Sequence, residues 1–236
     1  MGLKSYTEEK LNAWNEAEVK IAVTGQSGTG KSSLINRLRG LTPEDRKKPY
    51  YAKTGAGKET TSERREYEFP SSPLIKIYDL PGCGTPAFPR NSYADEMEFD
   101  IYDAFVILTK DRFLEEDKAV ATMIHTLAKP KPFFFCRSNM DETMKNAAKD
   151  ELEDFDHEKL EKNIRDDCLE NLEDRAEYAH AKHIYLLARD DPLVVKAGER
   201  EDTVKFPDNM KLKEDLIGSL NDLQRSAIRK LDFSIS

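Results

Sequence analysis

The stretch Gly25–Ser32 has the sequence GQSGTGKS, which fits the pattern GxxxxGK[ST]. Glycines at this spacing let the backbone curl so that successive N–H groups point at a chain of phosphates, and a following helix adds its positive end. In this pattern the Lys31 ammonium reaches the terminal phosphates, and the Ser32 hydroxyl ligates Mg²⁺. The residues predicted to bind a nucleotide's phosphates are Gly25, Gly28, Thr29, Gly30, Lys31, Ser32 and Ser33.

A second motif, Asp79-Leu80-Pro81-Gly82, follows the predicted strand that contains Ile75–Tyr78. A carboxylate at the end of a strand beside the phosphate loop can hold the hydration shell of Mg²⁺, while the Gly82 N–H can meet a γ-phosphate. Loss of that phosphate would then release the loop behind Gly82. A lone DxxG is common in ordinary turns. Placed one antiparallel strand pair after a phosphate loop, it indicates a GTPase-type switch.

Between these motifs lies a long loop, residues 41–58, followed by the pair Thr60-Thr61. Long loops in compact domains are usually functional. A GTPase needs a threonine on such a loop to close over Mg²⁺ and the γ-phosphate. Thr61 is our first choice and Thr60 the alternate, and an ordinary surface threonine is the other interpretation. The predicted catalytic residues are Lys31, Thr61 and Gly82, and the predicted metal ligands are Ser32, Thr61 and Asp79.

Base recognition is expected at Ser138-Asn139-Met140-Asp141, at the end of the predicted strand Phe133–Cys136. GTPases carry [N/T]KxD here: the carboxylate pairs with the imino and amino hydrogens of guanine, and the lysine stem covers the ring. Asp141 is in place, Asn139 replaces the lysine, and Ser138 stands where Asn or Thr is usual. One carboxylate that accepts two donors selects guanine against adenine. The alternative is that Asp141 merely caps the next helix.

Two further positions bear on this site. The last apolar run ends at Ala188-Arg189, whose backbone is placed to touch the base from its other side. Cys83 follows Gly82 at the position where many GTPases carry a glutamine that orients the attacking water. A thiol orients water poorly, so we expect slow intrinsic hydrolysis that a partner or a second copy accelerates. For Cys83 itself, a free thiol in a flexible turn is the simpler interpretation and a redox switch the alternative.

These residues must be positioned by alternating strands and helices. The pattern predicts strands over 19–24, 64–69, 74–78, 104–108, 133–136 and 182–187, and helices over 32–39, 115–129 and 210–231. Such alternation implies a three-layer α/β fold with a largely parallel sheet. Two strands joined by the turn at residues 70–73 predict one antiparallel edge strand.

The segment 141–181 is predicted to be a long acidic helical region. Apolar residues recur in it at a spacing that suits one buried helix face, namely Leu152, Phe155, Leu160, Ile164, Cys168 and Leu172. Its acidic outer side is most simply a solvated surface, with a partner-binding face as the alternative.

Composition excludes several classes of protein. The 236 residues hold 37 Lys and Arg against 45 Asp and Glu, a net charge of −8. Such a chain repels phosphate backbones over most of its surface, which argues against a dedicated nucleic-acid binder. Its three cysteines have neither metal-ligand spacing nor the density of a disulfide framework. Neither a signal peptide nor a membrane-spanning run is recognisable, and Tyr6 breaks the N-myristoylation pattern, so we expect a cytoplasmic protein.

Taken together, VTGQSGTGKSSLINRLRGL, ETT, DLPGCGTPAFP and YDAFVILTKDRFLEED resemble the immunity-related (interferon-inducible) GTPases of the GKS type. KPFFFCRSNMD and the ending FP…KLKEDLIGSL fit the same pattern. The resemblance implies a Ras-like P-loop domain with a mostly parallel six-stranded sheet that binds GTP or GDP with Mg²⁺. It also implies dynamin-like homo-dimers or oligomers in the GTP state and peripheral association with intracellular membranes. We divide the chain into a short N-terminal helix, 1–18, and a GTPase domain, 19–236.

Three functions are therefore weighed. The first is a GTPase that hydrolyses GTP slowly and whose nucleotide controls self-association. The second is an interaction module, gated by nucleotide or catalytically weak, with little turnover; the altered base motif and Cys83 favour it. The third, an ATPase or small-molecule kinase, is opposed by Asp141 and by the family resemblance.

Overall fold

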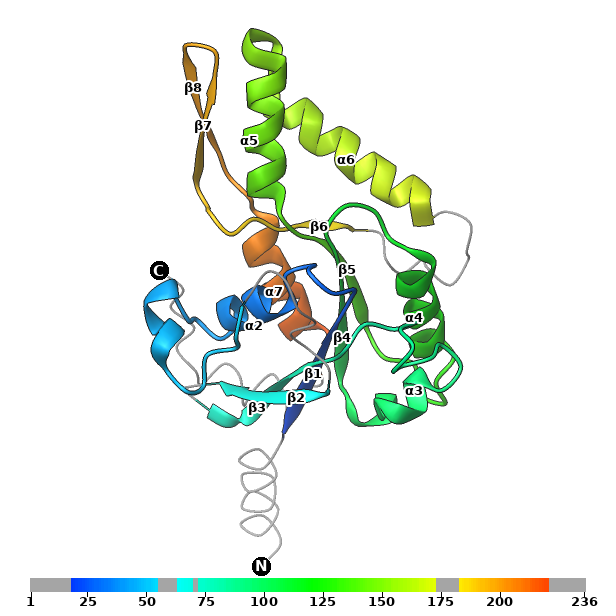
Figure 1. Ribbon diagram of the computed structural model, residues 1–236. Helices are drawn as coiled ribbons and strands as arrows, with labels where there is room; N and C mark the ends of the chain where they lie inside the picture. Colours follow the sequence, from blue (N-terminus) through cyan, green and yellow to red (C-terminus); the bar gives the residue numbers. More distant parts are fainter. Residues whose placement is uncertain (1–17, 55–62, 70–71, 173–182, 221–236) are drawn as a thin grey trace, which may run out of the picture.

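A six-stranded sheet forms the centre of the computed structural model, which describes residues 18–54, 63–69, 72–172 and 183–220 (Figure 1). The strand order is β2-β3-β1-β4-β5-β6; β2 runs antiparallel to β3 and the other neighbours are parallel. The strands are β1 (Val19–Thr24), β2 (Arg65–Phe69), β3 (Ser72–Asp79), β4 (Ala104–Thr109), β5 (Phe133–Arg137) and β6 (Tyr185–Leu186). The predicted three-layer α/β fold, with one antiparallel edge strand, is confirmed.

Helices cover both faces of this sheet, which is why its central strands β1 and β4 are largely apolar. Helices α2 (Lys31–Leu38) and α7 (Asp208–Gly218) pack on one face, and α3 (Tyr93–Glu96) and α4 (Glu115–His125) lie on the other (Figure 1). Every residue of β4 is buried. A strand with this pattern cannot face water on either side, as expected of a parallel sheet.

The loops that leave the parallel strands meet at one edge of the sheet. β1 lies between β3 and β4 in the sheet. The strands that follow β1 in the chain are therefore added first on its β3 side and then, from β4 onward, on its other side. Ligands of open α/β sheets bind outside the carboxyl ends of the strands at such a reversal of strand order. The phosphate loop after β1, the DxxG loop after β3 and the segment after β5 all start at this edge.

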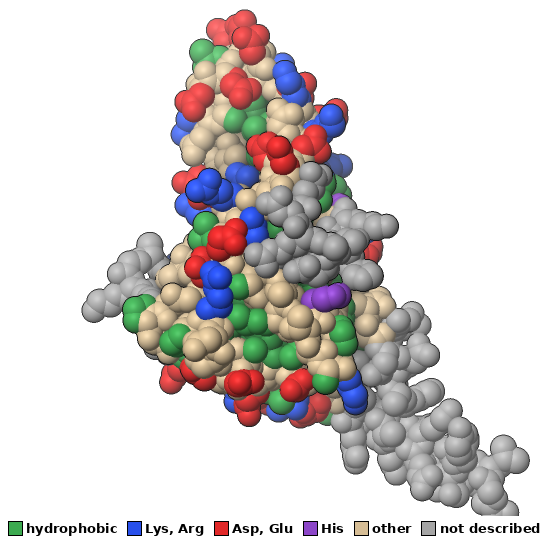
Figure 2. All heavy atoms as spheres, turned by 90° about the vertical axis from the view of Figure 1, so that its right-hand side faces the viewer, with side chains coloured by type: hydrophobic (Ala, Val, Ile, Leu, Met, Phe, Trp, Pro, Cys, Tyr) green, Lys and Arg blue, Asp and Glu red, His purple; other side chains and the backbone are tan. Residues whose placement is uncertain are grey.

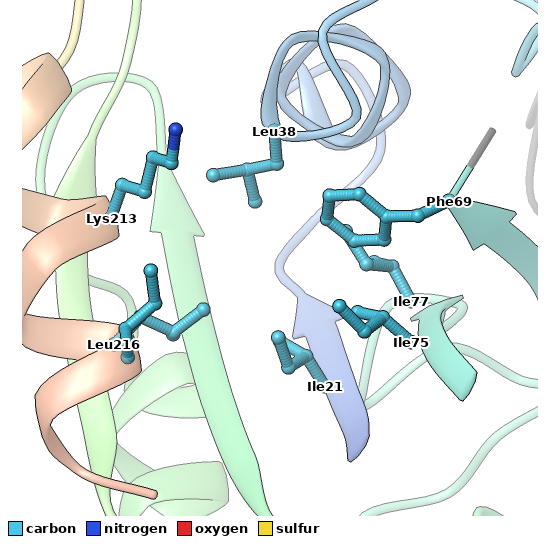
Figure 3. Close-up of a pocket in the computed structure, with 8 residues that line it drawn as sticks. Ile21, Leu38, Phe69, Ile75, Ile77, Lys213 and Leu216 are labelled. Atoms are coloured by element: carbon cyan, nitrogen blue, oxygen red, sulfur yellow. The ribbon is translucent and has the colours of Figure 1, made fainter. Parts of the chain in front are cut away.

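An apolar hollow lies between α2, α7 and the sheet (Figure 3). Aliphatic and aromatic side chains form its walls, with one amine at the rim: it is lined by Ile21, Leu38, Phe69, Ile75, Ile77, Lys213, Leu216 and Ile217. Walls of this kind offer a nucleotide no set of polar partners. We interpret the hollow as a gap in the packing of the helices on the sheet.

An extension rises from the β6 end of the sheet (Figure 1). It consists of α5 (Met140–Glu151), the short 3₁₀ helix η3 (Leu152–Asp154), α6 (His157–Leu172) and a hairpin of β7 (Leu193–Ala197) and β8 (Arg200–Val204). Alternate residues of β7 are buried, and β7 packs against α5. Acidic and basic side chains intermingle over the part of the extension seen in Figure 2.

The structure corrects several predicted boundaries. In its described part, up to Leu172, the helical region predicted over 141–181 is divided into α5 and α6, because the chain breaks at Leu152, which has a φ of 52° and is 53% exposed rather than buried. Phe155, Ile164, Cys168 and Leu172 are buried as predicted. The hairpin of β7 and β8 was not predicted, α4 ends at His125, and β6 is only two residues long.

Some predictions lie outside the described residues. These are the N-terminal helix up to residue 17, residues 55–62 of the long loop with Thr60 and Thr61, the turn residues 70–71, the stretch 173–182 and everything after Leu220. Short 3₁₀ helices, η1 (Pro43–Lys47) and η2 (Phe99–Ile101), complete the elements of the described part. Within that part, no helix combines the length and apolar character needed to cross a bilayer.

Candidate nucleotide-binding site

The phosphate loop joins β1 to α2 and is shaped by its glycines. Gly25 has a φ of 141°, and a Cβ atom there would lie 2.0 Å from the Leu108 carbonyl oxygen, so another residue cannot fit without moving the backbone. Gly30, with a φ of 91°, is the residue at which α2 begins. Both conformations are ones that side chains disfavour. The glycines of the motif are therefore required by the turn itself.

Lys31 opens α2 and folds back over the loop that precedes it. Its Nζ donates to the carbonyl oxygens of Gly25 at 2.9 Å and of Gln26 at 3.2 Å, and the residue is only 6% exposed. Burial lowers the pKa of Lys31, while the carboxylates of Asp79 and Asp117 act in the opposite direction. The ammonium is thus held at the loop by two neutral carbonyls, and phosphate oxygens are stronger partners for such a cation.

Ser32 and Asp79 bring two hard oxygen donors together beside Lys31. The Ser32 hydroxyl donates to Asp79 Oδ2 at 3.1 Å, and both residues are buried. Asp79 ends β3 directly opposite Val23 of the parallel strand β1. Hydroxyl and carboxylate oxygens suit Mg²⁺, which usually takes one or two protein ligands together with phosphates and waters. Among the described residues no cluster of three or more His, Cys, Asp or Glu could hold a metal by itself. The pair fits a nucleotide-bound Mg²⁺.

The loop after Asp79 is fastened at two points. The buried hydroxyl of Tyr93 donates to the Pro81 carbonyl oxygen at 2.6 Å. The Gln26 amide of the phosphate loop donates to the Cys83 carbonyl oxygen at 3.0 Å. A Cβ atom on Gly82 would lie 3.1 Å from Gln26 Oε1, so the two loops touch closely at this glycine. Neither Gln26 nor Tyr93 was among the predicted residues; Gln26 stands at a variable position of the motif, where spacing carries no signal.

Cys83 is part of the core rather than of an exposed flexible turn. The residue is 2% exposed, and burial raises the pKa of its thiol to about 11. The thiol is therefore neutral at physiological pH, and reactive thiols are partly exposed thiolates. This environment gives no support to a redox switch at Cys83, and its effect on the hydrolysis rate stays a prediction.

Asp117 is a buried carboxylate near Lys31 that the sequence analysis did not find. It is 3% exposed, and its Oδ2 accepts the N–H of Leu114 at 2.9 Å, which closes the first turn of α4. Burial raises the pKa of Asp117 to about 6, although the hydrogen bond from Leu114 and the charge of Lys31 lower it. In the sequence Asp117 is one of three consecutive acidic residues at a helix start, so nothing in the sequence distinguishes its buried environment from that of the other two.

The predicted base-binding segment begins α5 and touches the phosphate loop. Ser138 Oγ donates to the Thr29 carbonyl oxygen at 2.6 Å, which connects the two predicted halves of the site. Asn139 has a φ of 65° and is the N-cap residue of α5. Asp141 lies two residues further on and is 4% exposed. Because Asn139 occupies the cap position, the alternative that Asp141 serves as the cap loses its basis.

A polar hollow of about 280 Å³ opens beside Asp141. It is lined by Asn139, Asp141, Glu142, Lys145 and Arg189. Arg189 Nη2 lies 3.4 Å from Asp141 Oδ2, and Arg189 Nε lies 3.2 Å from Asp190 Oδ1. Lys145, which lies on α5, donates from its Nζ to Asp190 Oδ2 at 2.9 Å. The hollow thus joins the start of α5 to the loop between β6 and β7, as a base site would require.

Ala188 faces away from this hollow. Its N–H donates to Asn209 Oδ1 at 3.3 Å, its carbonyl oxygen accepts a hydrogen bond from Arg37, and the residue is 2% exposed. Arg37 also donates to Asn209 Oδ1 at 3.0 Å, and the Asn209 amide donates to Asp191 Oδ2 at 2.8 Å. These bonds hold the loop between β6 and β7 against α2 and α7.

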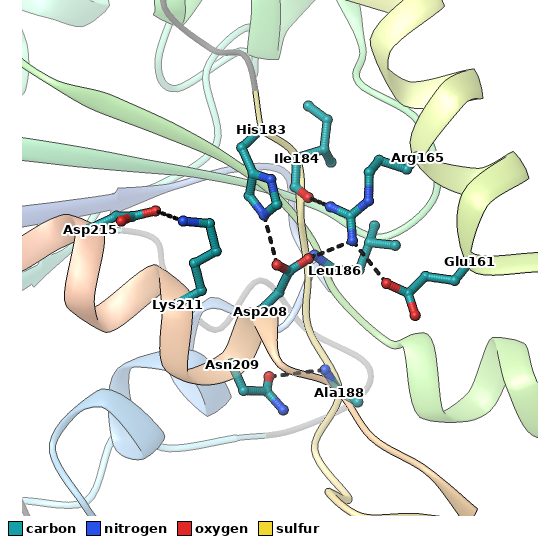
Figure 4. Close-up of polar contacts among 10 residues, drawn as sticks. All are labelled: Glu161, Arg165, His183, Ile184, Leu186, Ala188, Asp208, Asn209, Lys211 and Asp215. Atoms are coloured by element: carbon teal, nitrogen blue, oxygen red, sulfur yellow. Dashed lines mark hydrogen bonds and ion pairs between the residues drawn. The ribbon is translucent and has the colours of Figure 1, made fainter. Parts of the chain in front are cut away.

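Asp208, the first residue of α7, holds the short strand β6 in place (Figure 4). Its Oδ2 accepts the Leu186 N–H at 2.9 Å and an Arg165 N–H at 2.8 Å, while Oδ1 lies 2.7 Å from His183 Nε2. The Asp208 residue is 3% exposed. One buried carboxylate therefore connects α6, β6 and α7, and compensates for a strand that has only two residues.

The structure brings the predicted residues into two neighbouring groups. Lys31, Ser32, Asp79 and Gly82 lie around the phosphate loop, and Asp141 and Arg189 lie around the polar hollow. Ser138 lies between the groups. Thr60 and Thr61 fall outside the described residues, so their role as ligands stays a prediction. Base contact by the Ala188 backbone also stays a prediction.

Comparison with known proteins agrees with this geometry. The model of the interferon-inducible GTPase family matches residues 2–229. The chain is 38% identical over 165 residues to mouse interferon-inducible GTPase 1, covering 70% of this chain and 38% of the relative. It is 39% identical over 170 residues to mouse T-cell-specific guanine nucleotide triphosphate-binding protein 2, covering 72% and 40%. With bovine interferon-inducible GTPase 5 it shares 33% identity over 203 residues, covering 84% and 42%.

A solved structure supports the fold independently. The chain matches Toc33 from Arabidopsis thaliana, in a complex with GDP and Mg²⁺, with a TM-score of 0.52 and 16% identity, covering 96% of this chain and 93% of that one. The chain spans about two fifths of the length of the relatives named above. The match over nearly the whole chain confirms the resemblance seen in the motifs, and the chain belongs to the interferon-inducible GTPase family.

Proposed function

We propose that this chain binds GTP and GDP with Mg²⁺ and hydrolyses GTP slowly. The observation that carries the proposal is the pair Ser32–Asp79, with 3.1 Å between hydroxyl and carboxylate, next to the buried ammonium of Lys31. A phosphate loop with oxygen ligands beside it is the arrangement that phosphoryl transfer needs, because that chemistry depends on positioning and charge neutralisation. The family's members and the name of the mouse guanine nucleotide triphosphate-binding relative support the choice of nucleotide.

Each group then has a defined role. The Lys31 ammonium neutralises charge on the terminal phosphates, and Ser32 with Asp79 holds Mg²⁺, directly or through its waters. Bound Mg²⁺ stabilises the negative charge that develops on the transferred phosphoryl group. Thr61 closes from its loop over the same phosphates, and the Gly82 N–H senses the γ-phosphate. Asp141 receives the guanine base in the polar hollow.

Slow turnover follows from the environment of Cys83. Its neutral buried thiol takes the place of the glutamine that orients water in many GTPases. We infer that a second copy of the chain supplies the missing groups, so GTP promotes dimers or larger oligomers and turnover rises with association. From the family we further propose a cytoplasmic protein that acts peripherally on intracellular membranes.

The test is calorimetric titration of nucleotide-free protein with GTP, GDP and ATP, each with Mg²⁺. We expect binding of both guanine nucleotides and at least tenfold weaker binding of ATP. Asp141→Asn should reduce this preference, while Lys196→Ala, which changes an exposed residue of the hairpin, should not. Equal affinity for GTP and ATP in the unchanged protein would refute guanine recognition.

The second candidate, an interaction module with little turnover, is favoured by one observation. Asn139 replaces the lysine of the base motif and its amide bonds to Glu142 at 2.6 Å. The specific rate of GTP hydrolysis, measured over a hundredfold range of protein concentration, separates the two candidates. A rate that rises with concentration supports a self-activating GTPase. Binding without measurable turnover at any concentration supports the module.

A further inference from the structure

We propose that Arg189 replaces the missing lysine of the base motif and covers the face of the guanine ring held by Asp141. This inference rests on the proposed function, because it describes how the same site binds its base. In the usual motif one long cationic side chain lies over the ring and a carboxylate grips its edge. Here the carboxylate remains, but the residue at the lysine position is the short Asn139.

Among the described residues that line the polar hollow, two long cations, Lys145 and Arg189, are candidates for the cover. The Asn139 amide points to Glu142, at 2.6 Å, and Lys145 is paired with Asp190 at 2.9 Å. Arg189 is 74% exposed along its side chain, yet its guanidinium reaches to 3.4 Å from Asp141 Oδ2. Arg189 Nε also pairs with Asp190 Oδ1, at 3.2 Å. Of the two cations that contact Asp190, Arg189 is the one whose guanidinium also lies 3.4 Å from Asp141, the carboxylate that would select the base.

Arg189 can make this contact without blocking the base. The guanidinium touches Asp141 at a single oxygen and at a loose distance. A carboxylate has about four lone-pair positions, which leaves room for the two donors of guanine. The ion pairs of Arg189 with Asp141 and with Asp190 are both weak because the cation is this exposed, so the guanidinium can pivot while the side chain stays near Asp141. Guanine is neutral, so a cation kept at this place also continues to compensate the charge of the nearly buried Asp141.

The chemistry of arginine suits a stacking role. The guanidinium is planar and weakly hydrated, and it stacks on the faces of aromatic rings and nucleobases. Stacking of this kind depends on the ring and not on the groups at its edge. Arg189 is therefore expected to contribute affinity for any purine that reaches the hollow, whereas Asp141 contributes the preference for guanine.

The experiment compares Arg189→Ala and Arg189→Lys with the unchanged protein, using GDP and inosine diphosphate, which lacks the exocyclic amino group. Arg189→Ala should weaken the binding of both ligands by about tenfold, a value between those of an exposed and a desolvated cation–π contact, and keep the ratio of the two affinities. Arg189→Lys should recover part of the loss. The control is Lys196→Ala, which removes an equal charge from a side chain that is 75% exposed.

Other results would overturn the inference. Unchanged or tighter GDP binding in Arg189→Ala would show that Arg189 makes no contact or competes with the base for Asp141. A loss confined to GDP would show that Arg189 acts through the recognition of the amino group. If the unchanged protein binds neither diphosphate, the proposed function itself fails; if it binds GDP and only the variants behave differently from expectation, the failure belongs to Arg189 alone.

Discussion

The phosphate half and the base half of the site are built in different ways. In the phosphate half, Lys31 and Ser32 are buried in one continuous segment whose glycine conformations are required by backbone contacts. The base half brings together Asp141 from the start of α5 and an exposed Arg189 from the loop between β6 and β7, about fifty residues later, and bonds to three helices hold that loop. Phosphate binding depends on local backbone geometry, whereas base binding depends on how distant segments are assembled. It is in the base half that the sequence departs from the usual motif.

The largest expected effect tests the phosphate half. Lys31→Ala removes the cation that neutralises the terminal phosphates. We expect a loss of about 3 kcal/mol, more than a hundredfold in the dissociation constant for GTP, because charged hydrogen bonds are the strongest contacts of the loop. Calorimetry with GTP and GDP measures it, with Lys196→Ala as the surface control. Unchanged affinity in Lys31→Ala would remove the basis for the phosphate site.

Next in size is the carboxylate of the base half. Asp141→Asn keeps the shape of the side chain but presents an amide hydrogen where guanine also has a donor. We expect GDP affinity to fall by about 2 kcal/mol, about thirtyfold, while ATP affinity changes little. The ratio of the two constants is the informative quantity. A parallel loss for both nucleotides would mean that Asp141 supports the fold of α5 and does not recognise the base.

The same contrast explains what could be predicted from the sequence. The strand Val19–Thr24 was predicted to the residue, and Lys31, Ser32 and Asp79 lie together beside the phosphate loop, while their roles as ligands stay predictions. These features depend on local spacing and on a buried strand. The extension was harder to predict because its sequence pattern is weaker. The hairpin of β7 and β8 is short and charged, and the buried residues of β7 alternate over only five positions. The contacts of Ala188 with Asn209 and Arg37 join segments that spacing cannot relate.

A smaller effect concerns the charge buried beneath the phosphate half. Burial raises the pKa of Asp117 from 3.8 to about 6, so between these pH values the folded chain binds the proton more tightly than the unfolded chain. The free energy of unfolding contributed by this group therefore falls as the pH rises through that window. Asp117→Asn keeps an acceptor for the Leu114 N–H and removes the charge. It should stabilise the protein by about 1 kcal/mol at pH 7 and by little at pH 4.

Urea unfolding of both proteins at a series of pH values measures this difference. The comparison between variant and unchanged protein cancels the titration of the other carboxylates. Glu116→Gln, at the neighbouring half-exposed position, is the matched control and should change the pH profile much less. If Asp117→Asn were destabilising at pH 7 by the same amount as at pH 4, the carboxylate would not carry an unfavourable buried charge.

The smallest effect tests whether the base half really depends on remote support. Asn209 accepts from the Ala188 N–H and from Arg37 and donates to Asp191, yet it lies on α7 and outside the polar hollow. Asn209→Ala should loosen the loop that carries Arg189 and weaken GDP binding by about threefold, less than one hydrogen bond's full contribution.

Met210→Ala, at an exposed position on the same helix, should leave the affinity unchanged. Because Asn209 touches no part of the phosphate loop, pyrophosphate binding should stay the same. An equal loss for GDP and pyrophosphate would mean that the two halves form one cooperative unit, and the contrast between them would then lie in their sequence alone.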